Sequence, residues 1–261
     1  WEVDCFGARL RRPFSYHQYQ HPRKYTGKMP VLLYLNKEKI VILTGAGISA
    51  ESGLSTFRDS GGLWKSFSVY EVATPEGWEA NPEIVLEFYN QRRRKVALAQ
   101  PNAAHLAVAK LEEAFDVTIV TQNVDNLHEK AGSTKVVHVH GEITKARSSA
   151  DPALISDIGY EDIQLGDTCD EGSQLRPHIV WFGESVQNME AAAKHVEEAD
   201  KVLVIGTSLS VYPAAGLVDY AQASAEKVLV ALEMDHLPDG FRFYQGKATE
   251  QIPKIIEKWM G

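Results

Sequence analysis

The residues at 39–58 could bind an anion, because a short apolar run there leads into a pair of glycines. The run at 40–43 is rich in β-branched residues and precedes Gly45 and Gly47, which is typical of a buried strand entering a tight turn. A helix starting after the turn would offer N–H groups and its dipole to a phosphate. Ala50 stands where dinucleotide-binding turns often have a third glycine. The pattern indicates either a dinucleotide site or an ordinary strand-to-helix turn.

The segment after this turn argues against a hydride-transfer enzyme. A dehydrogenase-type unit would continue into a second strand that carries an acidic residue about 20 positions further on. Residues 53–62 instead form a polar, glycine-containing stretch with Thr56, Phe57 and Arg58. We expect a loop that covers a bound dinucleotide; the alternative is a surface turn in which Phe57 fills a gap.

A phenol and a guanidinium group share one face of a predicted helix over 82–99. Pro82 suits the first turn, and Val85, Tyr89, Arg92 and Val96 recur at helical spacing. Tyr89 and Arg92 could together bind a ligand carboxylate. The alternative is an arginine that lies over a solvated basic face.

Polar residues also follow other apolar runs. Gln122, Asn123 and Asp125 come after the run at 117–120, and His140 comes after the run at 135–139. Polar groups at the carboxyl ends of parallel strands are typical of an open α/β ligand site. Gly206, Thr207 and Ser208 form a second candidate anion-binding turn after the run at 201–205.

Length and composition predict an ordinary globular protein. The chain has 261 residues, of which 44% are hydrophobic and 24% charged. A net charge of -8 argues against direct nucleic-acid binding. Two cysteines, Cys5 and Cys169, are too few for a disulfide framework. No apolar run approaches 18 residues, so we expect no membrane-spanning helix.

Six apolar runs alternate with helices or long connections, at 40–43, 117–120, 135–139, 179–182, 201–205 and 228–232. This alternation predicts an α/β fold with a doubly wound, parallel, six-stranded, Rossmann-like sheet. We expect an irregular N-terminal arm over 1–38 and a catalytic domain over 39–261. Insertions at about 62–100 and 144–177 would form a smaller module. The first 28 residues are basic, and an organelle transit segment is the alternative to an arm.

Five ordered motifs resemble those of the sirtuins, which are NAD-dependent protein-lysine deacylases. They are GAGISAESGLSTFR at 45–58, TQNVDNLHEKAG at 121–132, HGE at 140–142, VWFGE at 180–184 and GTSLSVYPAA at 206–215. The resemblance covers roughly residues 39–250. It implies that NAD is consumed as a co-substrate: the acyl-lysine oxygen displaces nicotinamide, and the acyl group ends on ADP-ribose.

The resemblance also implies site residues. His140 resembles the general base, and a histidine suits proton removal from a ribose hydroxyl near neutral pH; Asn123 belongs to the same catalytic centre. His138 and His128 are expected to be structural. The residues implied for NAD are Gly45, Ala46, Gly47, Ala50, Glu51, Thr56, Phe57, Arg58, Gln122, Asn123, Asp125, Gly206, Thr207, Ser208, Leu232, Glu233 and Ala248.

The substrate implied is an acyl-lysine peptide, bound in extended form along Val180, Trp181, Phe182 and Gly183 by strand addition. Tyr89 and Arg92 match the Tyr-x-x-Arg signature of the bacterial and mitochondrial class III branch, where the pair binds a succinyl or malonyl carboxylate. Ala73 would leave room for a larger acyl group. The resemblance therefore implies desuccinylation and demalonylation alongside deacetylation.

Two departures from the family pattern stand out. Sirtuins usually carry four zinc-binding cysteines between HGE and VWFGE, whereas this interval holds only Cys169. Structural zinc needs four protein ligands, so we expect no bound metal. Related sequences often have Asn-Leu-Glu after the last strand; Ala231 stands here before Leu232 and Glu233, so one contact to the adenosine ribose is expected to be lost.

These departures leave two alternatives. One is an NAD-dependent mono-ADP-ribosyltransferase on the same fold, and the other is a non-catalytic NAD-binding or interaction module. The presence of His140, Asn123 and Asp125 argues against the second, because binding alone needs no base. We expect a cytoplasmic protein without membrane association; a mitochondrial location is the alternative.

Overall fold

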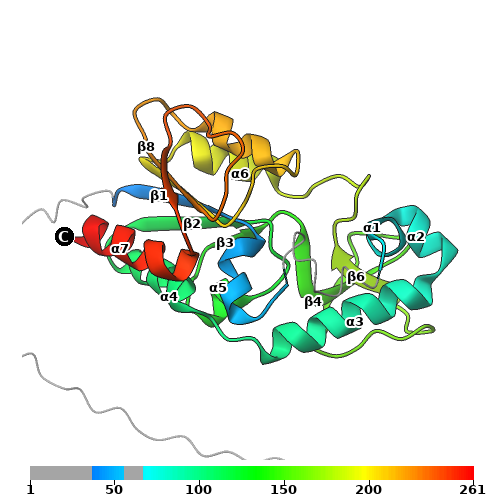
Figure 1. The fold of residues 1–261 in the computed structure, drawn as a ribbon. Helices are drawn as coiled ribbons and strands as arrows, with labels where there is room; N and C mark the ends of the chain where they lie inside the picture. The colour runs from blue at the N-terminus through cyan, green and yellow to red at the C-terminus, as the bar shows by residue number, and fades with distance from the viewer. Residues whose placement is uncertain (1–36, 56–66) are drawn as a thin grey trace, which may run out of the picture. The chain divides into compact units, whose positions relative to one another are not determined.

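The computed structural model describes residues 37–55 and 67–261 (Figure 1). Its central element is a sheet of six strands in the order β3-β2-β1-β7-β8-β9, and every neighbouring pair is parallel. The expected doubly wound sheet is therefore confirmed. Its strands are β1 (Lys39–Thr44), β2 (Asp116–Thr121), β3 (Val136–His138), β7 (Lys201–Ile205), β8 (Glu226–Ala231) and β9 (Arg242–Gln245).

The strand order reverses direction between β1 and β7. The chain adds β2 and β3 on one side of β1, then returns to add β7, β8 and β9 on the other side. In open parallel sheets, ligands bind in the crevice at such a reversal, outside the carboxyl ends of the strands. The fold therefore places the candidate site after Thr44 and Ile205.

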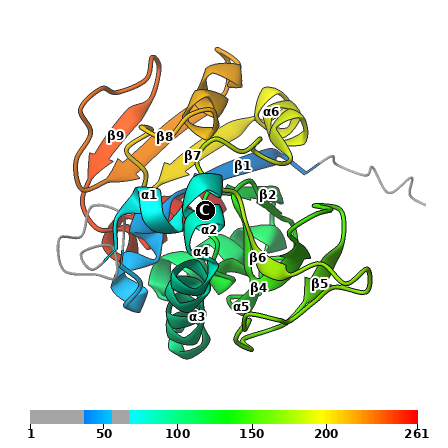
Figure 2. The same ribbon diagram turned by 90° about the vertical axis from the view of Figure 1, so that its right-hand side faces the viewer.

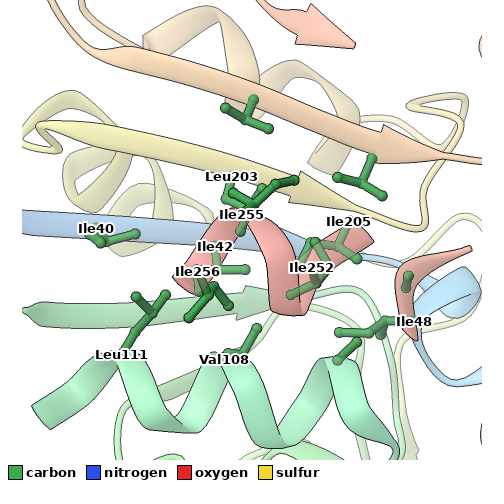
Figure 3. Packing of buried hydrophobic residues seen from close by; sticks show 14 of the residues in the cluster. Ile40, Ile42, Ile48, Val108, Leu111, Leu203, Ile205, Ile252, Ile255 and Ile256 are labelled. Atoms are coloured by element: carbon green, nitrogen blue, oxygen red, sulfur yellow. The ribbon is translucent and has the colours of Figure 1, made fainter. Parts of the chain in front are cut away.

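Alternating side chains of β1 build a core on each face of the sheet. Ile40 and Ile42 join a cluster with α4 (Ala103–Lys110) and α7 (Ala248–Met260), as Figure 3 shows. Val41 and Leu43 join a second cluster with α6 (Met189–Glu197) and the 3-10 helix η5 (Ala214–Tyr220). This burial on both faces explains why β1 has the continuous apolar sequence of a central parallel strand.

A smaller module holds an antiparallel sheet in the order β5-β4-β6, beside three helices (Figure 2). Its strands are β4 (Gly141–Ser148), β5 (Ile155–Asp157) and β6 (Leu175–Ile179). Its helices are α1 (Val69–Val72), α2 (Pro75–Ala80) and α3 (Pro82–Leu98). The remaining short helices are η1 (Ala46–Ile48), η2 (Ala50–Ser52), η4 (Leu111–Glu113) and α5 (Leu127–Lys130).

One predicted strand of the parallel sheet was wrong. The run at 179–182 is not in that sheet: β6 ends at Ile179 and pairs antiparallel with β4. The chain then turns, because the Glu184 carboxylate accepts a hydrogen bond from the Trp181 N–H at 2.8 Å. The sixth parallel strand is β9, whose residues are exposed at both ends and half-buried in the middle and lack the apolar run of a central strand.

The long helix α3 fastens the smaller module. Its Asn90 side chain donates to the Ile163 carbonyl at 2.9 Å and accepts from the Ile163 N–H at 3.0 Å. Arg93 is fully buried and donates to the Ile143 carbonyl at 2.8 Å; burial lowers the pKa of Arg93 to about 10. These bonds tie β4 and the loop before β6 to one rigid helix.

The helix over 82–99 was predicted well, and the chain begins α3 at Pro82. The Asn81 side chain accepts from the Ile84 N–H at 3.1 Å and so caps the helix. Among the described residues, no helix combines the length and hydropathy needed to cross a membrane.

Candidate active site

Two glycine turns cross at the carboxyl ends of β1 and β7. The Gly45 N–H donates to the Ile205 carbonyl at 3.0 Å, and the Gly47 N–H donates to the Gly206 carbonyl at 2.8 Å. Gly206 has a φ of +64°, and a Cβ there would lie 2.4 Å from the Ile48 nitrogen. Only glycine fits so close a backbone approach. The two turns that the sequence indicated separately are therefore one structure.

The turn after β1 does not open into an α-helix. Two 3-10 helices, η1 and η2, follow in its place, separated by Ser49. The helix expected to start after the turn is therefore present only as short 3-10 helices. The described part of the turn places Gly45, Ala46, Gly47 and Ala50 beside the crossing.

Asn123 is fixed at this crossing by four hydrogen bonds. Its side-chain amide donates to the Gly45 carbonyl and to Ser49 Oγ, both at 3.2 Å. Its backbone N–H donates to Thr121 Oγ1 at 3.0 Å, and its carbonyl accepts from His138 Nδ1 at 3.0 Å. The side chain is 6% exposed. Such a fixed amide can orient a ligand without a cost in rotamer entropy.

Ser49 joins Asn123 to Asp125, and sequence reasoning missed it. A hydrogen bond from the Ser49 side chain reaches the Asp125 carboxylate. Burial raises the pKa of Asp125, while the bonds from the Leu127 N–H and Ser49 and the charge of Arg92 oppose that shift. Serine within a glycine turn is common, so its type carried no signal; only the fold brings β1 and the segment after β2 together.

His140 has the hydrogen bonding of a neutral base. Its Nδ1 lies 3.1 Å from the Gln122 carbonyl. A carbonyl only accepts, so Nδ1 carries the proton, and the neutral ring offers the lone pair of Nε2. Burial lowers the pKa of His140, and the bond to Gln122 opposes that shift. The ring is therefore held as neutral imidazole near neutral pH.

His138 has surroundings that favour its charged form, and it bonds the segment that carries Asn123. Its Nε2 lies 2.8 Å from the Glu129 carboxylate, while Nδ1 donates to the Asn123 carbonyl. Burial disfavours the imidazolium, but the hydrogen bond and negative charge of Glu129 outweigh it and raise the pKa of His138. The same partner lowers the pKa of Glu129 against the effect of its own burial. His138 has the structural role that the sequence suggested.

Two more histidines lie buried next to the crossing. His128 Nε2 lies 3.1 Å from Thr44 Oγ1, and its ring is 5.0 Å from that of His105. Burial lowers the pKa of His105 to about 4 and that of His128 well below its usual value. Both rings are therefore neutral, and His128 is a structural hydrogen-bonding residue, as expected.

Tyr89 and Arg92 lie on the inner side of α3. Tyr89 is 3% exposed, and its hydroxyl oxygen accepts from Trp181 Nε1 at 3.1 Å. Arg92 is half-buried, and burial lowers its pKa while the nearby Tyr89 and Asp125 favour its charged form. The structure thus brings the predicted phenol and guanidinium to the segment that holds Asp125.

The structure describes most of the other residues expected near NAD. Glu51 accepts from Thr249 Oγ1 at 2.6 Å and pairs with Lys247 at 3.3 Å, so it ties η2 to the start of α7. Thr207 Oγ1 accepts from Gln122 Nε2 at 3.4 Å, which links the second turn to β2. Ser208 bonds Ser210 in the same turn, Leu232 and Glu233 are exposed after β8, and Ala248 is buried at the start of α7. Thr56, Phe57 and Arg58 lie outside the described residues.

The segment expected to bind a peptide has its first three N–H groups already paired. The N–H groups of Val180, Trp181 and Phe182 donate to His140, Glu184 and Ala73 at 3.0, 2.8 and 2.9 Å. The Trp181 side chain is 2% exposed, whereas Phe182 is 47% exposed and Gly183 has a φ of +90°. The Glu184 N–H also donates, to the Trp181 carbonyl at 3.0 Å, so a peptide strand would find backbone donors at Gly183 and beyond Glu184.

The family model of the Sir2 family matches residues 45–213, which include the crossing turns, Asn123 and His140. A relative from Bacteroides thetaiotaomicron, named NAD-dependent protein deacylase, is 52% identical over 198 residues, covering 74% of this chain and 85% of its own. A Helicobacter pylori relative of the same name is 47% identical over 226 residues, covering 84% of this chain and 98% of its own. The chain belongs to the Sir2 family.

Solved structures agree with this membership. A complex of a Sir2 homologue with NAD matches with a TM-score of 0.75 at 37% identity, covering 85% of this chain and 89% of that chain. A Sir2 protein with a deacetylated peptide and 3′-O-acetyl ADP-ribose matches with a TM-score of 0.73 at 31% identity, covering 85% of this chain and 94% of that chain. The Sir2 fold therefore extends through both the large sheet and the smaller module.

The ion pair behind Asn123 makes a pH-dependent prediction. A raised pKa of His138 gives stability that is complete below pH about 6.5 and is lost as pH rises through the folded-state pKa. Glu129→Gln should therefore lower the thermal midpoint by about 2–4 °C more at pH about 6 than at pH about 9. Thermal unfolding followed by circular dichroism gives the thermal midpoint at each of the two pH values. Glu197→Gln, an exposed carboxylate on α6, is the control; an equal loss at the two pH values would contradict the charged pair.

Proposed function

We propose that this Sir2 chain, an NAD-dependent protein deacylase like the relatives it matches, removes succinyl and malonyl groups from lysine as well as acetyl groups. The observation that carries the proposal is the placement of Tyr89 and Arg92 on the inner side of α3, next to Asp125. By sequence resemblance, the pair puts the chain in the class III branch of the family.

Charge decides between the acyl groups. Burial of the Arg92 guanidinium lowers its pKa, while Tyr89 and Asp125 favour its charged form. A succinyl or malonyl carboxylate would add a charge-assisted hydrogen bond to this guanidinium. An acetyl group has no carboxylate to form that bond. Ala73 is buried in the same cluster as Tyr89, and a larger side chain at this position would compete with a longer acyl chain.

Tyr89 would serve as the second donor to that carboxylate. Burial raises the pKa of Tyr89 to about 12, against the effects of the Trp181 hydrogen bond and the charges of Arg92 and Arg176. The phenol therefore stays protonated at neutral pH and keeps a hydrogen to donate. A phenolate would instead repel the acyl carboxylate.

The residues of the crossing fit NAD as co-substrate. The close backbone approach of Gly47 and Gly206 keeps side chains out of the crossing, so a pyrophosphate would meet backbone there, although the N–H groups of Gly45 and Gly47 are already paired. Asn123 and Asp125 would hold the nicotinamide half, and Gly206, Thr207 and Ser208 the adenosine half. NAD supplies the ribose carbon that accepts the acyl oxygen as nicotinamide leaves.

His140 is the general base of the proposed reaction. The Gln122 carbonyl holds the proton on Nδ1, so Nε2 is the atom that would take a proton from a ribose hydroxyl. The lowered pKa keeps the His140 ring unprotonated near neutral pH. The peptide would add along the segment after Gly183. We also propose a cytoplasmic location, with a mitochondrial location as the alternative.

The smaller module does not fit the zinc that many relatives in this family hold. Among residues 37–55 and 67–261, no three His, Cys, Asp or Glu side chains are grouped as a metal site. Cys169 instead hydrogen-bonds Ser148, which with backbone N–H groups lowers the pKa of the thiol. Ser148 Oγ also accepts from the N–H groups of Ala150 and Asp151, both at 3.2 Å. We propose that these bonds and the α3 contacts hold the module without metal.

Replacing Arg92 tests the acyl preference. Arg92→Met removes the charge and keeps much of the apolar side chain, so the ratio of kcat/KM for succinyl-lysine to that for acetyl-lysine peptides should fall at least about tenfold. Steady-state kinetics on two peptides that differ only in the acyl group give the ratio. Lys95→Met, an exposed cation on the same helix, should leave it unchanged. Equal losses of kcat/KM on both peptides would contradict the proposed acyl-group specificity.

Metal content tests the module. Purified protein should hold less than about 0.1 zinc per chain, because four ligands are needed and the smaller module has one thiol, Cys169. A strong chelator should change neither the thermal midpoint nor deacylation, and Cys169→Ser should keep the bond to Ser148 and unfold within about 2 °C of the parent. One zinc per chain by elemental mass spectrometry, removed with loss of stability, would refute a metal-free module.

A further inference from the structure

A buried hydrogen bond joins the peptide-side segment to the acyl-binding helix. Trp181 Nε1 lies 3.1 Å from the Tyr89 hydroxyl oxygen, and both side chains are almost fully buried, at 2% and 3% exposed. The two residues come from the turn after β6 and from α3. In the described part of the chain, no other hydrogen bond from the turn after β6 is made to the phenol oxygen.

The chemistry of the two groups fixes the direction of this bond. An indole N–H can only donate, so the phenol oxygen is the acceptor. A phenol that accepts through a lone pair keeps its own hydrogen for a different partner. The Trp181 bond thus holds the oxygen in place and directs the O–H of Tyr89 away from the indole.

Trp181 is itself held from two sides. The Arg176 guanidinium carbon lies 3.2 Å from the centre of the indole ring, and the Glu184 carboxylate accepts from the Trp181 N–H at 2.8 Å. Glu184 also pairs with Arg176 and Arg147, each at 2.8 Å. Their hydrogen bonds and charges, together with the Trp181 N–H, outweigh burial and lower the pKa of Glu184. The indole ring therefore lies against the guanidinium of this charged cluster, and the backbone N–H of Trp181 is bonded to the carboxylate of the same cluster.

We propose that Trp181 is a specificity-determining residue, whose indole N–H positions the Tyr89 hydroxyl to donate to the carboxylate of an acidic acyl group. The inference rests on the proposed desuccinylase function and extends it to a residue that acts through Tyr89. The Trp181 side chain then acts, through Tyr89, in recognition of the acyl group, whereas the peptide would contact only the backbone of this segment.

A double-mutant cycle tests this coupling. Trp181→Phe removes the N–H and keeps an aromatic ring against Arg176. It should lower the succinyl-to-acetyl ratio of kcat/KM by about threefold to tenfold, mainly through a higher KM for the succinyl peptide. Tyr89→Phe should lower the ratio at least as much. The double variant should match Tyr89→Phe, because the indole acts only through the phenol.

The matched control is Trp78→Phe. Trp78 lies 5.8 Å from Trp181, ring centre to ring centre, in the same hydrophobic cluster. Trp78→Phe should leave the succinyl-to-acetyl ratio of kcat/KM unchanged. If Trp181→Phe fails to fold, benzothienylalanine at position 181 keeps the shape of indole and lacks the N–H donor.

The outcomes separate the two proposals. Losses that add in the double variant, or an unchanged ratio in Trp181→Phe beside a lowered ratio in Tyr89→Phe, would overturn the role of Trp181 and leave the desuccinylase proposal intact. An unchanged ratio in Tyr89→Phe and in Arg92→Met would overturn the desuccinylase proposal and the role of Trp181 with it.

Discussion

The hydrogen bond from the Gly47 N–H to the Gly206 carbonyl, 2.8 Å long, is the contact on which the site depends. It joins the turns after β1 and β7 at the point where the strand order reverses. A side chain at Gly45, Gly47 or Gly206 would collide with the opposite turn. Because the backbones meet there directly, Asn123 can reach the Gly45 carbonyl and Ser49, and the segment after β2 is fixed against the turn after β1.

A second set of constraints lies around α3. The helix carries Tyr89 and Arg92 toward Asp125, and through Asn90 and Arg93 it holds the smaller module in place. Trp181, Arg176 and Glu184 then connect the turn after β6 to Tyr89. One helix therefore both carries the proposed acyl-binding pair and fastens the smaller module.

The sequence predicted the parallel sheet because its central strands are buried on both faces and so read as continuous apolar runs. The sequence did not correctly predict the edge strand β9 or the structure at 179–182. β9 has half-exposed residues, and the run at 179–182 is apolar because Trp181 packs behind Tyr89, not because it belongs to the parallel sheet. Edge strands and buried turns cannot be separated by apolar content alone.

The site was predictable where polar residues follow strands, as at Asn123 and His140. It was not predictable where function depends on contacts between distant segments. Ser49, Glu129 and Trp181 belong to types that are common in turns, helices and cores, and their roles follow only from bonds to Asp125, His138 and Tyr89. The raised pKa of His138 and the lowered pKa of His140 likewise come from burial and partners, not from spacing.

The central claim is that NAD is consumed in transferring an acidic acyl group from lysine. The most direct measurement incubates the protein with NAD and a succinyl-lysine peptide and follows the products by mass spectrometry. The account predicts free lysine peptide, nicotinamide and O-succinyl-ADP-ribose in equal amounts. ADP-ribose attached to the peptide or to the protein, with the succinyl group still on lysine, would instead indicate an ADP-ribosyltransferase. No consumption of NAD with succinyl or acetyl peptides would contradict a catalytic role altogether.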